Sequence, residues 1–292
     1  MIFNMHNPKH TTGTILLAGA SGYLGNYITR ELINQNIPAK IIVRHLNKLS
    51  TINSPLIRKI KAEVTQPETL RGICEGVSTL ISCIGITRQK DGLTYMDVDY
   101  QANINLLHEA QRAGVKKFIF VAALNGQYHR QLKIMAAKER FVDALKVSGM
   151  DYCIIRPNGF FSDMADFLSM AKKGKVYLFG DGNHKLNPIH GADLAKICLN
   201  AINSECQEIE AGGPDVLSQN EIAEMALKAC SKPLQIVHLP DWIRRITIKL
   251  LRTFTSPKTY GPPEFFLTFM GQNNVADQYG HRHLIDFFYE IK

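Results

Sequence analysis

Residues 14–28 read TILLAGASGYLGNYI, and this stretch decides the fold class. An apolar, strand-like run leads directly into glycines at positions 19, 22 and 25 and then into a run with helical periodicity. A strand, a glycine-rich turn and a helix in this order predict a site for the phosphates of a dinucleotide. Gly19 would make the tight turn, Gly22 would let a pyrophosphate approach the backbone, and Gly25 would let the helix pack on the sheet. A plain strand-to-helix turn is the alternative.

Short apolar runs alternate with helical patterns through the first half of the chain. The sequence predicts strands at residues 14–18, 40–44, 57–64, 79–84, 117–122 and 151–156. Between them we expect helices, one of which carries Leu24, Ile28 and Leu32 at four-residue spacing. Strands that are apolar throughout and are separated by helices indicate a parallel sheet covered on both faces. The expected fold is therefore α/β, a doubly wound parallel sheet of the Rossmann type with a smaller C-terminal lobe.

The pattern changes after Pro157, where strand-like pieces become sparse and loops rich in glycine and proline appear. We expect residues 1–13 to form a flexible arm and residues 14–156 to form the dinucleotide-binding domain. Residues 157–292 would form the smaller substrate lobe, partly interleaved with the sheet.

The composition is that of a soluble globular protein, with 45% hydrophobic and 21% charged residues among 292. No apolar run reaches the roughly 18 residues that a membrane-spanning helix needs, and the N-terminus lacks the apolar core of a signal peptide. The six cysteines form no CxxC pair, which favours reduced thiols in the cytoplasm. The net charge of +8 suits anionic ligands, but no nucleic-acid-binding motif accompanies it. His281 and His283 lack a third ligand at usual spacing, so we expect a surface pair and no metal site.

The end of the second strand predicts which dinucleotide binds. Folds selective for NAD carry an acid about 20 residues past the glycines, which binds the adenine ribose. Here the sequence is VRHLNK, with Arg44 and Lys48 and no acid. An arginine fork suits a 2′-phosphate, so we expect NADP(H) to be preferred over NAD(H). The alternative is a solvated basic loop.

A lysine stands on the apolar face of a predicted helix at residues 133–142, KIMAAKERFV. On a helical wheel Lys138 falls within the stripe that contains Ile134 and Phe141, while Glu139 falls on the opposite face. Such a lysine must reach water, lose its proton or meet an anion.

Four segments of the chain carry a resemblance to the short-chain dehydrogenase/reductase superfamily. They are GASGYLG (19–25), VDYQANINLLHEAQRAGVKKFIFVAAL (98–124), AKERFVDALKVSGMDYCIIRPNGFF (137–161) and FGDGNHKLNPIHGADLA (179–195). The sequence is most similar to the atypical, extended branch, with its NmrA-like, isoflavone-reductase-like and divinyl-chlorophyllide-reductase-like proteins. The resemblance covers nearly the whole chain and implies a bound NAD(P) cofactor.

The superfamily usually relies on Ser, Tyr and Lys, with the Tyr four residues before the Lys. Lys138 matches the lysine, but Ile134 occupies the place of the tyrosine and Ala122-Ala123 that of the serine. Because neither Ile nor Ala can donate a proton to a developing alkoxide, carbonyl reduction by the usual route is not expected.

The resemblance implies that Lys138 bonds the nicotinamide ribose hydroxyls. Because an ammonium on an apolar stripe needs compensation, we expect Lys138→Met to keep or raise stability while weakening NADPH binding. The residues expected to hold the cofactor lie at the carboxyl ends of the first, second, fourth and sixth strands and beside them: Gly19, Ala20, Ser21, Gly22, Tyr23, Leu24, Gly25, Arg44, Cys83, Ile84, Gly85, Lys138, Pro157, Asn158, Gly159 and Phe160.

No catalytic residue is assigned from the sequence. The candidates are Lys138, Tyr128, His129 and Asn158, and each has an ordinary structural explanation as well. Phe160 and Phe161 could line the nicotinamide or an apolar substrate, or could belong to the core.

Residues 242–263, WIRRITIKLLRTFTSPKTYGPP, contain five basic residues and no acid. On a helical wheel Trp242, Ile246 and Leu250 share one face, and Arg245 and Lys249 lie opposite. Such a basic amphipathic helix can make weak contact with a membrane surface, here through residues 242–258, or can pack on a partner. More commonly its apolar face packs into the core of its own protein.

Two functions of different classes fit these features. The first is an NADP(H)-dependent reductase of a small apolar enone, quinone or alkene, which would not need the missing tyrosine. The second is a non-catalytic NAD(P)-binding sensor or assembly factor of the NmrA-like type. The missing Ser and Tyr favour the sensor, whereas the aromatic RPNGFF segment (156–161) and a full second lobe favour the reductase. The substrate and the oligomeric state are left open by the sequence.

Overall fold

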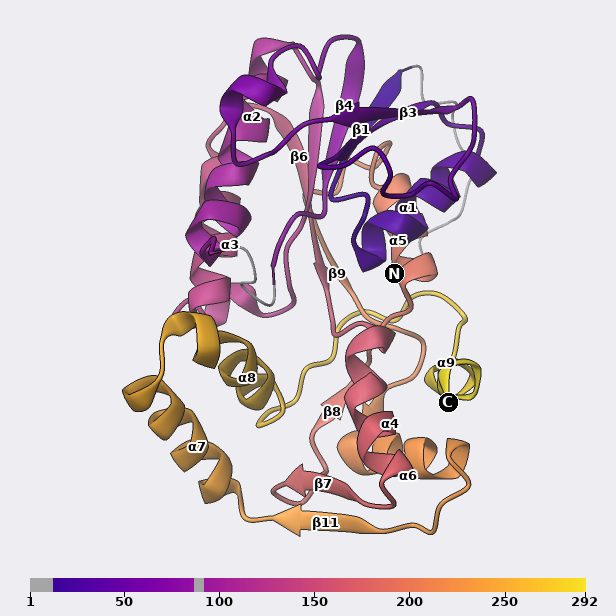
Figure 1. The fold of residues 1–292 in the computed structure, drawn as a ribbon, viewed down its shortest axis with the longest axis vertical. Helices are drawn as coiled ribbons and strands as arrows, with labels where there is room; N and C mark the ends of the chain where they lie inside the picture. The colour runs from indigo at the N-terminus through magenta and orange to yellow at the C-terminus, as the bar shows by residue number, and fades with distance from the viewer. Residues whose placement is uncertain (1–12, 87–91) are drawn as a thin grey trace.

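The structure is a computed structural model that describes residues 13–86 and 92–292, so most of the expected N-terminal arm lies outside the described residues. Its centre is a seven-stranded, wholly parallel sheet in the order β3-β2-β1-β4-β5-β6-β9 (Figure 1). The strands are β1 (Thr14–Ala18), β2 (Ala39–Val43), β3 (Ile57–Lys61), β4 (Val77–Ser82), β5 (Lys117–Val121), β6 (Asp151–Pro157) and β9 (Glu208–Ala211). The strand order reverses between β1 and β4, as in a Rossmann sheet, and the expected α/β class is confirmed.

Helices cover both faces of the sheet, with α1 (Tyr23–Asn34) and α5 (Gly191–Asn200) on one side and α2 (Ala102–Arg112) and α3 (Lys133–Lys146) on the other (Figure 1). Alternate side chains of β1 enter different cores: Ile15 packs with the α1 and α5 layer, and Leu16 packs with the α2 and α3 layer. This is why the strands read as apolar throughout.

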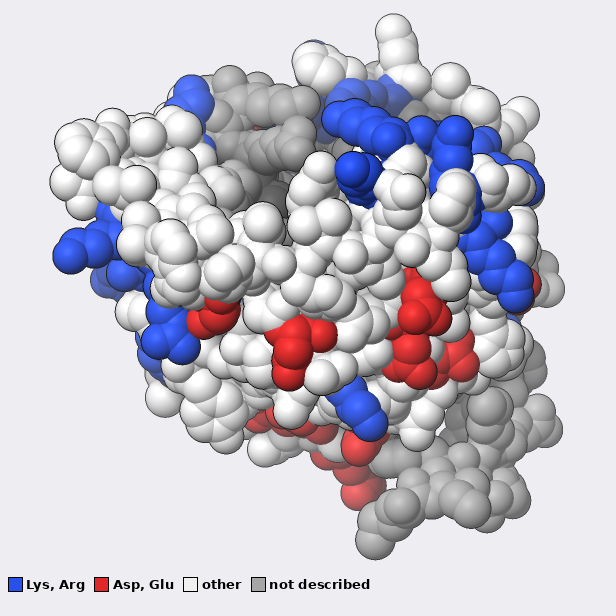
Figure 2. Space-filling view, turned by 90° about the horizontal axis from the view of Figure 1, so that it is seen from below, with Lys and Arg blue, Asp and Glu red and all other residues white. Residues whose placement is uncertain are grey.

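The remaining elements form a lobe below the sheet in Figure 1. They are α4 (Ala165–Lys172), β7 (Val176–Phe179), β8 (Lys185–Leu186), β10 (Leu217–Ser218), α6 (Gln219–Ala229), β11 (Ile236–Leu239), α7 (Asp241–Phe254), α8 (Pro257–Phe269) and α9 (Leu284–Ile291). Helices α4, α6 and α9 share a core that includes Phe167, Ile222 and Phe288. Seen from the lower end, the surface carries basic side chains at its left edge and in a band at the upper right (Figure 2).

Four short helical segments complete the described chain: η1 (Pro67–Leu70), the π-helical η2 (Met96–Gln101), η3 (Gly126–Tyr128) and η4 (Phe161–Met164). Two elements that follow residue 157 belong to the sheet and its helical layer, since β9 pairs with β6 and α5 packs on α1. The division of function between 14–156 and 157–292 stays a prediction.

A buried ion-pair network fixes α3 to the sheet. The guanidinium of Arg156, on β6, donates to both carboxylate oxygens of Glu139 at 2.6 and 3.1 Å and also to Glu208 of β9. Glu139, which the helical wheel places opposite the apolar stripe, is thus fully buried. A helical wheel identifies the apolar face of a helix, but it cannot show that a neighbouring strand supplies a buried cation.

Candidate functional site

The turn between β1 and α1 needs glycine at two positions. Gly19 has φ +91°, and a Cβ on it would lie 2.9 Å from the Sγ of Cys83. A Cβ on Gly25 would lie 2.1 Å from the carbonyl oxygen of Gly19, so the helix could not approach the turn. At Gly22 the closest atom is that same oxygen, at 3.3 Å from an added Cβ. Gly22 is thus the glycine whose missing side chain leaves space in front of the turn.

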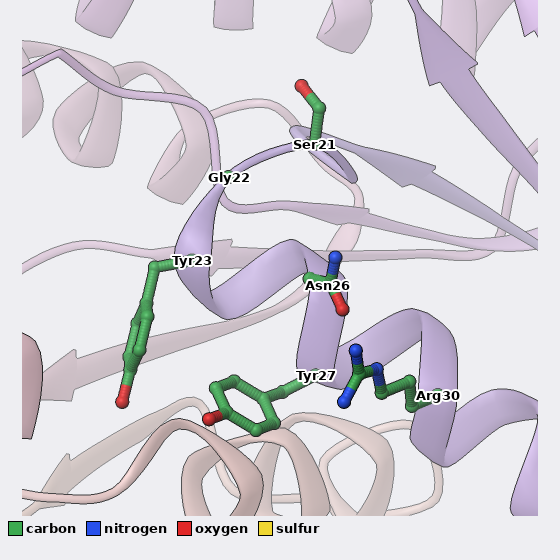
Figure 3. Close-up of a pocket in the computed structure, with 6 residues that line it drawn as sticks. All are labelled: Ser21, Gly22, Tyr23, Asn26, Tyr27 and Arg30. Atoms are coloured by element: carbon green, nitrogen blue, oxygen red, sulfur yellow. The ribbon is translucent and has the colours of Figure 1, made fainter. Parts of the chain in front are cut away.

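Helix α1 begins beside this space with Gly22 at its N-cap, where no side chain can cap the helix. The first N–H groups of a helix have no intrahelical partner, and with the helix dipole they attract phosphate. A shallow hollow of about 320 Å³ opens here (Figure 3). Its lining is Ser21, Gly22, Tyr23, Asn26, Tyr27 and Arg30.

Arg30 brings a positive charge to this hollow, and its guanidinium points back along α1 toward Asn26 and Tyr27 (Figure 3). Asn26, Tyr27 and Arg30 were not predicted from the sequence. Their helical spacing from Gly22 was the signal that could have found them.

The segment after β4 links the glycine turn to Lys138. The Sγ of Cys83 donates to the carbonyl of Ala18 at 3.3 Å, and burial raises the pKa of this thiol to about 12, so it stays protonated. Two residues further, a Cβ on Gly85 would lie 2.6 Å from the Nζ of Lys138. The backbone of Gly85 therefore lies directly against the ammonium group.

Lys138 meets an anion, which resolves the three alternatives open in the sequence. Its Nζ lies 2.9 Å from the Oδ1 of Asp99, with side-chain exposures of 12% for the lysine and 0% for the aspartate. The other oxygen, Oδ2, accepts from the N–H of Ile86 at 3.2 Å. Among the described residues, no donor is aligned for a hydrogen bond to Oδ1. The negative charge on this oxygen is therefore balanced by the ammonium of Lys138.

Burial raises the pKa of Asp99, and the neighbouring Lys138 and the N–H of Ile86 oppose that rise. Asp99 lies in η2, and π-helical turns occur often at functional sites. Asp99 was not predicted from the sequence as a site residue. Its signal was the same as that of Lys138, a charged residue at a core-facing position of an apolar-periodic segment.

The positions that lack the superfamily's tyrosine and serine lie in an apolar cluster next to this pair. Its buried members are Tyr95, Leu132, Ile134, Met135 and Ala137, and Ile86, Met96, Tyr100, Ala123, Phe265 and Phe269 pack against them. Helix α8 supplies the two phenylalanines, and its Gly261 approaches Tyr95 so closely that a Cβ would lie 2.6 Å from the hydroxyl. The surroundings of Lys138 on this side are thus apolar and are covered by α8.

Of the other catalytic candidates, His129 and Asn158 have structural partners. Tyr128 is 73% exposed on η3. The ring of His129 packs on Phe269 with centroids 5.0 Å apart, its Nε2 lies 2.7 Å from the Nε2 of Gln272, and burial lowers its pKa.

Asn158 is part of a buried amide network. Its Nδ2 donates to Asn187 and to the carbonyl of Asn274, both at 2.7 Å, and its Oδ1 accepts from the N–H of Gly159 at 2.8 Å. These contacts join the end of β6 to the lobe.

The remaining predicted cofactor residues lie at the carboxyl edge of the sheet. Arg44 follows β2 directly and is exposed, and β2 is the neighbour of β1. Past Pro157, the last residue of β6, the ring of Phe160 lies 5.5 Å from that of Tyr23, beside the glycine turn. Phe161 belongs instead to the lobe core, where it is buried because His190 and Phe287 pack on its ring.

His283 pairs with Asp215 through Nδ1 at 2.9 Å, which raises the pKa of the histidine. Within residues 13–86 and 92–292, no three His, Cys, Asp or Glu side chains are arranged to hold a metal ion. In the same part of the chain, every helix is too short or too polar to cross a bilayer. The cytoplasmic location stays a prediction.

Comparison with known proteins agrees with a dinucleotide site at the glycine turn. The family model described as NAD(P)H-binding matches residues 19–205. The chain belongs to this NAD(P)H-binding family. The expected NAD(P)-binding protein with similarity to divinyl chlorophyllide reductases is confirmed by this match and by the relatives.

Two curated relatives carry different functions. The photosystem II assembly factor Ycf39 of Synechocystis is 24% identical over 246 residues, which are 82% of this chain and 74% of the relative. The chloroplastic divinyl chlorophyllide a 8-vinyl-reductase of Oryza sativa subsp. indica is 26% identical over 264 residues, or 81% of this chain but only 64% of the relative. The chain therefore spans less than two thirds of that reductase.

Solved structures share the fold. The NADPH complex of the quinone oxidoreductase QOR2 from Escherichia coli has a TM-score of 0.71 at 17% identity and covers 95% of this chain and 99% of its own. An isoflavone reductase also has a TM-score of 0.71 at 17% identity, with coverages of 96% and 99%.

Proposed function

We propose that this chain is an NADPH-dependent reductase of a small apolar substrate that contains a conjugated double bond or a quinone. The observation that carries the proposal is the Lys138–Asp99 pair, which lies against Gly85 and next to the apolar cluster under α8. Burying a charged pair costs free energy. This pair lies near the end of β4 and the glycine turn, and dinucleotides bind at the carboxyl ends of the strands in such sheets.

The residues present fit an NADP cofactor. The turn at Gly19–Gly25 leaves the space that a pyrophosphate needs, the uncapped start of α1 offers N–H groups, and Arg44 can pair with a 2′-phosphate. Bound there, the dinucleotide would supply hydride.

Lys138 has two roles in this proposal. Its ammonium bonds the ribose hydroxyls, and it places positive charge beside an oxygen that becomes negative when a conjugated C=C is reduced. Asp99 and Gly85 fix the ammonium in place. The apolar cluster excludes water from the same region, and the proton reaches the substrate from water or from a loop group.

A non-catalytic NAD(P)-binding sensor or assembly factor is the second candidate. Ile134 and Ala123 in place of the tyrosine and serine favour it, and so does the covering of the apolar cluster by α8. One of the relatives is named as an assembly factor.

Steady-state NADPH consumption with a panel of quinones and enones separates the two candidates. The control is Gly22→Asp, which places a carboxylate in the phosphate space. Consumption above this control with at least one acceptor supports the reductase. Tight NADPH binding without consumption above the control for any acceptor supports the sensor.

A further inference from the structure

Helix α7 exposes an apolar stripe instead of burying it. Four large side chains stand on one face at four-residue intervals: Trp242, Ile246, Leu250 and Phe254, with exposures of 60, 46, 50 and 77%. We name this set the α7 stripe. Arg244 is the residue of α7 that is buried. The common arrangement, with the apolar face of a surface helix in the core, is therefore not the one found.

Polar contacts hold α7 in this orientation. Arg244 donates from Nε to Asp241 at 2.6 Å and from Nη1 to the carbonyl of Leu267 at 3.0 Å. Arg252 pairs with Glu264, a buried acid on α8. These contacts tie α7 to α8 and leave the stripe on the outside. Contiguous exposed apolar surface of this kind marks an interaction site.

The charges around the stripe indicate the chemistry of the partner. Arg245 and Lys249 are exposed on α7, and Lys258 follows at the start of α8. Asp241, the acid of α7, is already bonded by Arg244 and Arg245.

A second basic group lies at the same end of the molecule. Lys172, Lys232 and Lys292 line a shallow hollow beside the ends of α4 and α6. In the view from below, basic side chains edge the left side, where α7 lies, and form a band at the upper right, while most acids lie between or below them (Figure 2). The stripe, with the exposed Arg245, Lys249 and Lys258 on the same two helices, complements a surface that is apolar within and anionic outside.

We infer that the edge of the lower face formed by α7 docks on an anionic lipid bilayer, with α7 parallel to the membrane plane. The helix has 14 residues, or about 21 Å, and lies at the headgroup boundary rather than across the bilayer. The stripe enters the acyl boundary, with Trp242 at the interface that tryptophan prefers. The basic residues pair with lipid phosphates. This inference does not rest on the proposed reductase activity.

Co-sedimentation with vesicles tests the inference. The full chain is mixed with vesicles of phosphatidylcholine alone and with vesicles that contain an equal share of phosphatidylglycerol. The stripe variant carries Trp242→Gln and Leu250→Gln. The control carries Val147→Gln, which removes an exposed apolar side chain remote in sequence from α7 and from the proposed cofactor site.

The parent and the control should sediment with the anionic vesicles, and added salt should weaken this binding. The stripe variant should bind about tenfold more weakly, since it loses two of the four apolar side chains that would enter the bilayer. Both variants should keep the thermal unfolding midpoint and the NADPH affinity of the parent, because the altered side chains are exposed.

Three results would overturn the inference: no binding of the parent to either vesicle, equal binding to neutral and anionic vesicles, or unchanged binding of the stripe variant. If the parent binds no vesicle but dimerises in sedimentation velocity, and the stripe variant is monomeric, the stripe is an interface between two copies of this chain.

Discussion

The ammonium of Lys138 lies 2.9 Å from the Oδ1 of Asp99, a carboxylate whose side chain has no exposed surface. The pair connects α3 to η2 across the backbone of Gly85. It explains a lysine on an apolar helix face, and it makes that lysine part of the fold as well as of the proposed cofactor site.

Lys138→Met should lower the free energy of unfolding by about 3–5 kcal/mol, because it leaves a buried carboxylate without its counter-ion. This reverses the expectation from the sequence alone, in which the lysine had no partner. Urea denaturation measures the effect. The double variant Lys138→Met/Asp99→Asn, which removes both charges, should recover most of the loss.

The loss in Lys138→Met should depend on pH. Burial already raises the pKa of Asp99, and removal of Lys138 takes away the charge that opposes the rise. The folded variant then binds a proton at pH values where the unfolded chain, with an ordinary aspartate, does not, so its stability falls as pH increases above about 4. Denaturation should show a larger deficit at pH 8 than at pH 5. A deficit that is smaller at pH 8 would contradict this account of the pair.

Replacing Gly25 or Gly22 of the turn by alanine should affect stability to different extents. Gly25→Ala places a Cβ 2.1 Å from a backbone oxygen and should lower both stability and NADPH affinity. Gly22→Ala meets that oxygen at 3.3 Å, so the fold should survive while the cofactor loses space. Thermal unfolding and calorimetric titration with NADPH check both variants. Equal loss of stability in the two would show that Gly22 also serves packing.

Arg44→Ala should remove much of a preference for NADPH over NADH, since the guanidinium is the predicted partner of the 2′-phosphate. Titration of the parent and the variant with both cofactors measures the preference. NADH affinity serves as the control and should change little. Equal affinities of the parent for the two cofactors would refute the assignment.

The sheet and the glycine turn were predictable because their signals are local: apolar runs, glycine spacing and helical periodicity lie within a few residues of one another. The pairs Lys138–Asp99 and Arg156–Glu139 could not be predicted, since the two residues of each pair lie on different elements. The sequence around one residue does not indicate which residue is its partner. Periodicity identified the apolar face of α7 but not its direction. That direction depends on Arg244 and on its acceptor, the carbonyl of Leu267 on α8.

Turnover should not require a tyrosine next to Lys138, because Ile134 occupies that place. Tyr128→Phe should therefore keep kcat/KM within about twofold, because the side chain of Tyr128 is 73% exposed on η3. The pH profile of NADPH consumption should be the same for the parent and for Tyr128→Phe. A large loss in Tyr128→Phe at unchanged NADPH affinity would assign the proton donor to Tyr128.

Transfer of deuterium is the most direct test of the reductase proposal. NADPH that carries deuterium at C4 of the nicotinamide is supplied with each quinone or enone that supports consumption, and the product is examined by mass spectrometry. The proposal predicts deuterium on an enone carbon or, for a quinone, stoichiometric NADP formation with the hydroquinone, in both cases lost in Gly22→Asp. Tight binding of NADPH with no deuterated or reduced product from any acceptor would contradict the reductase.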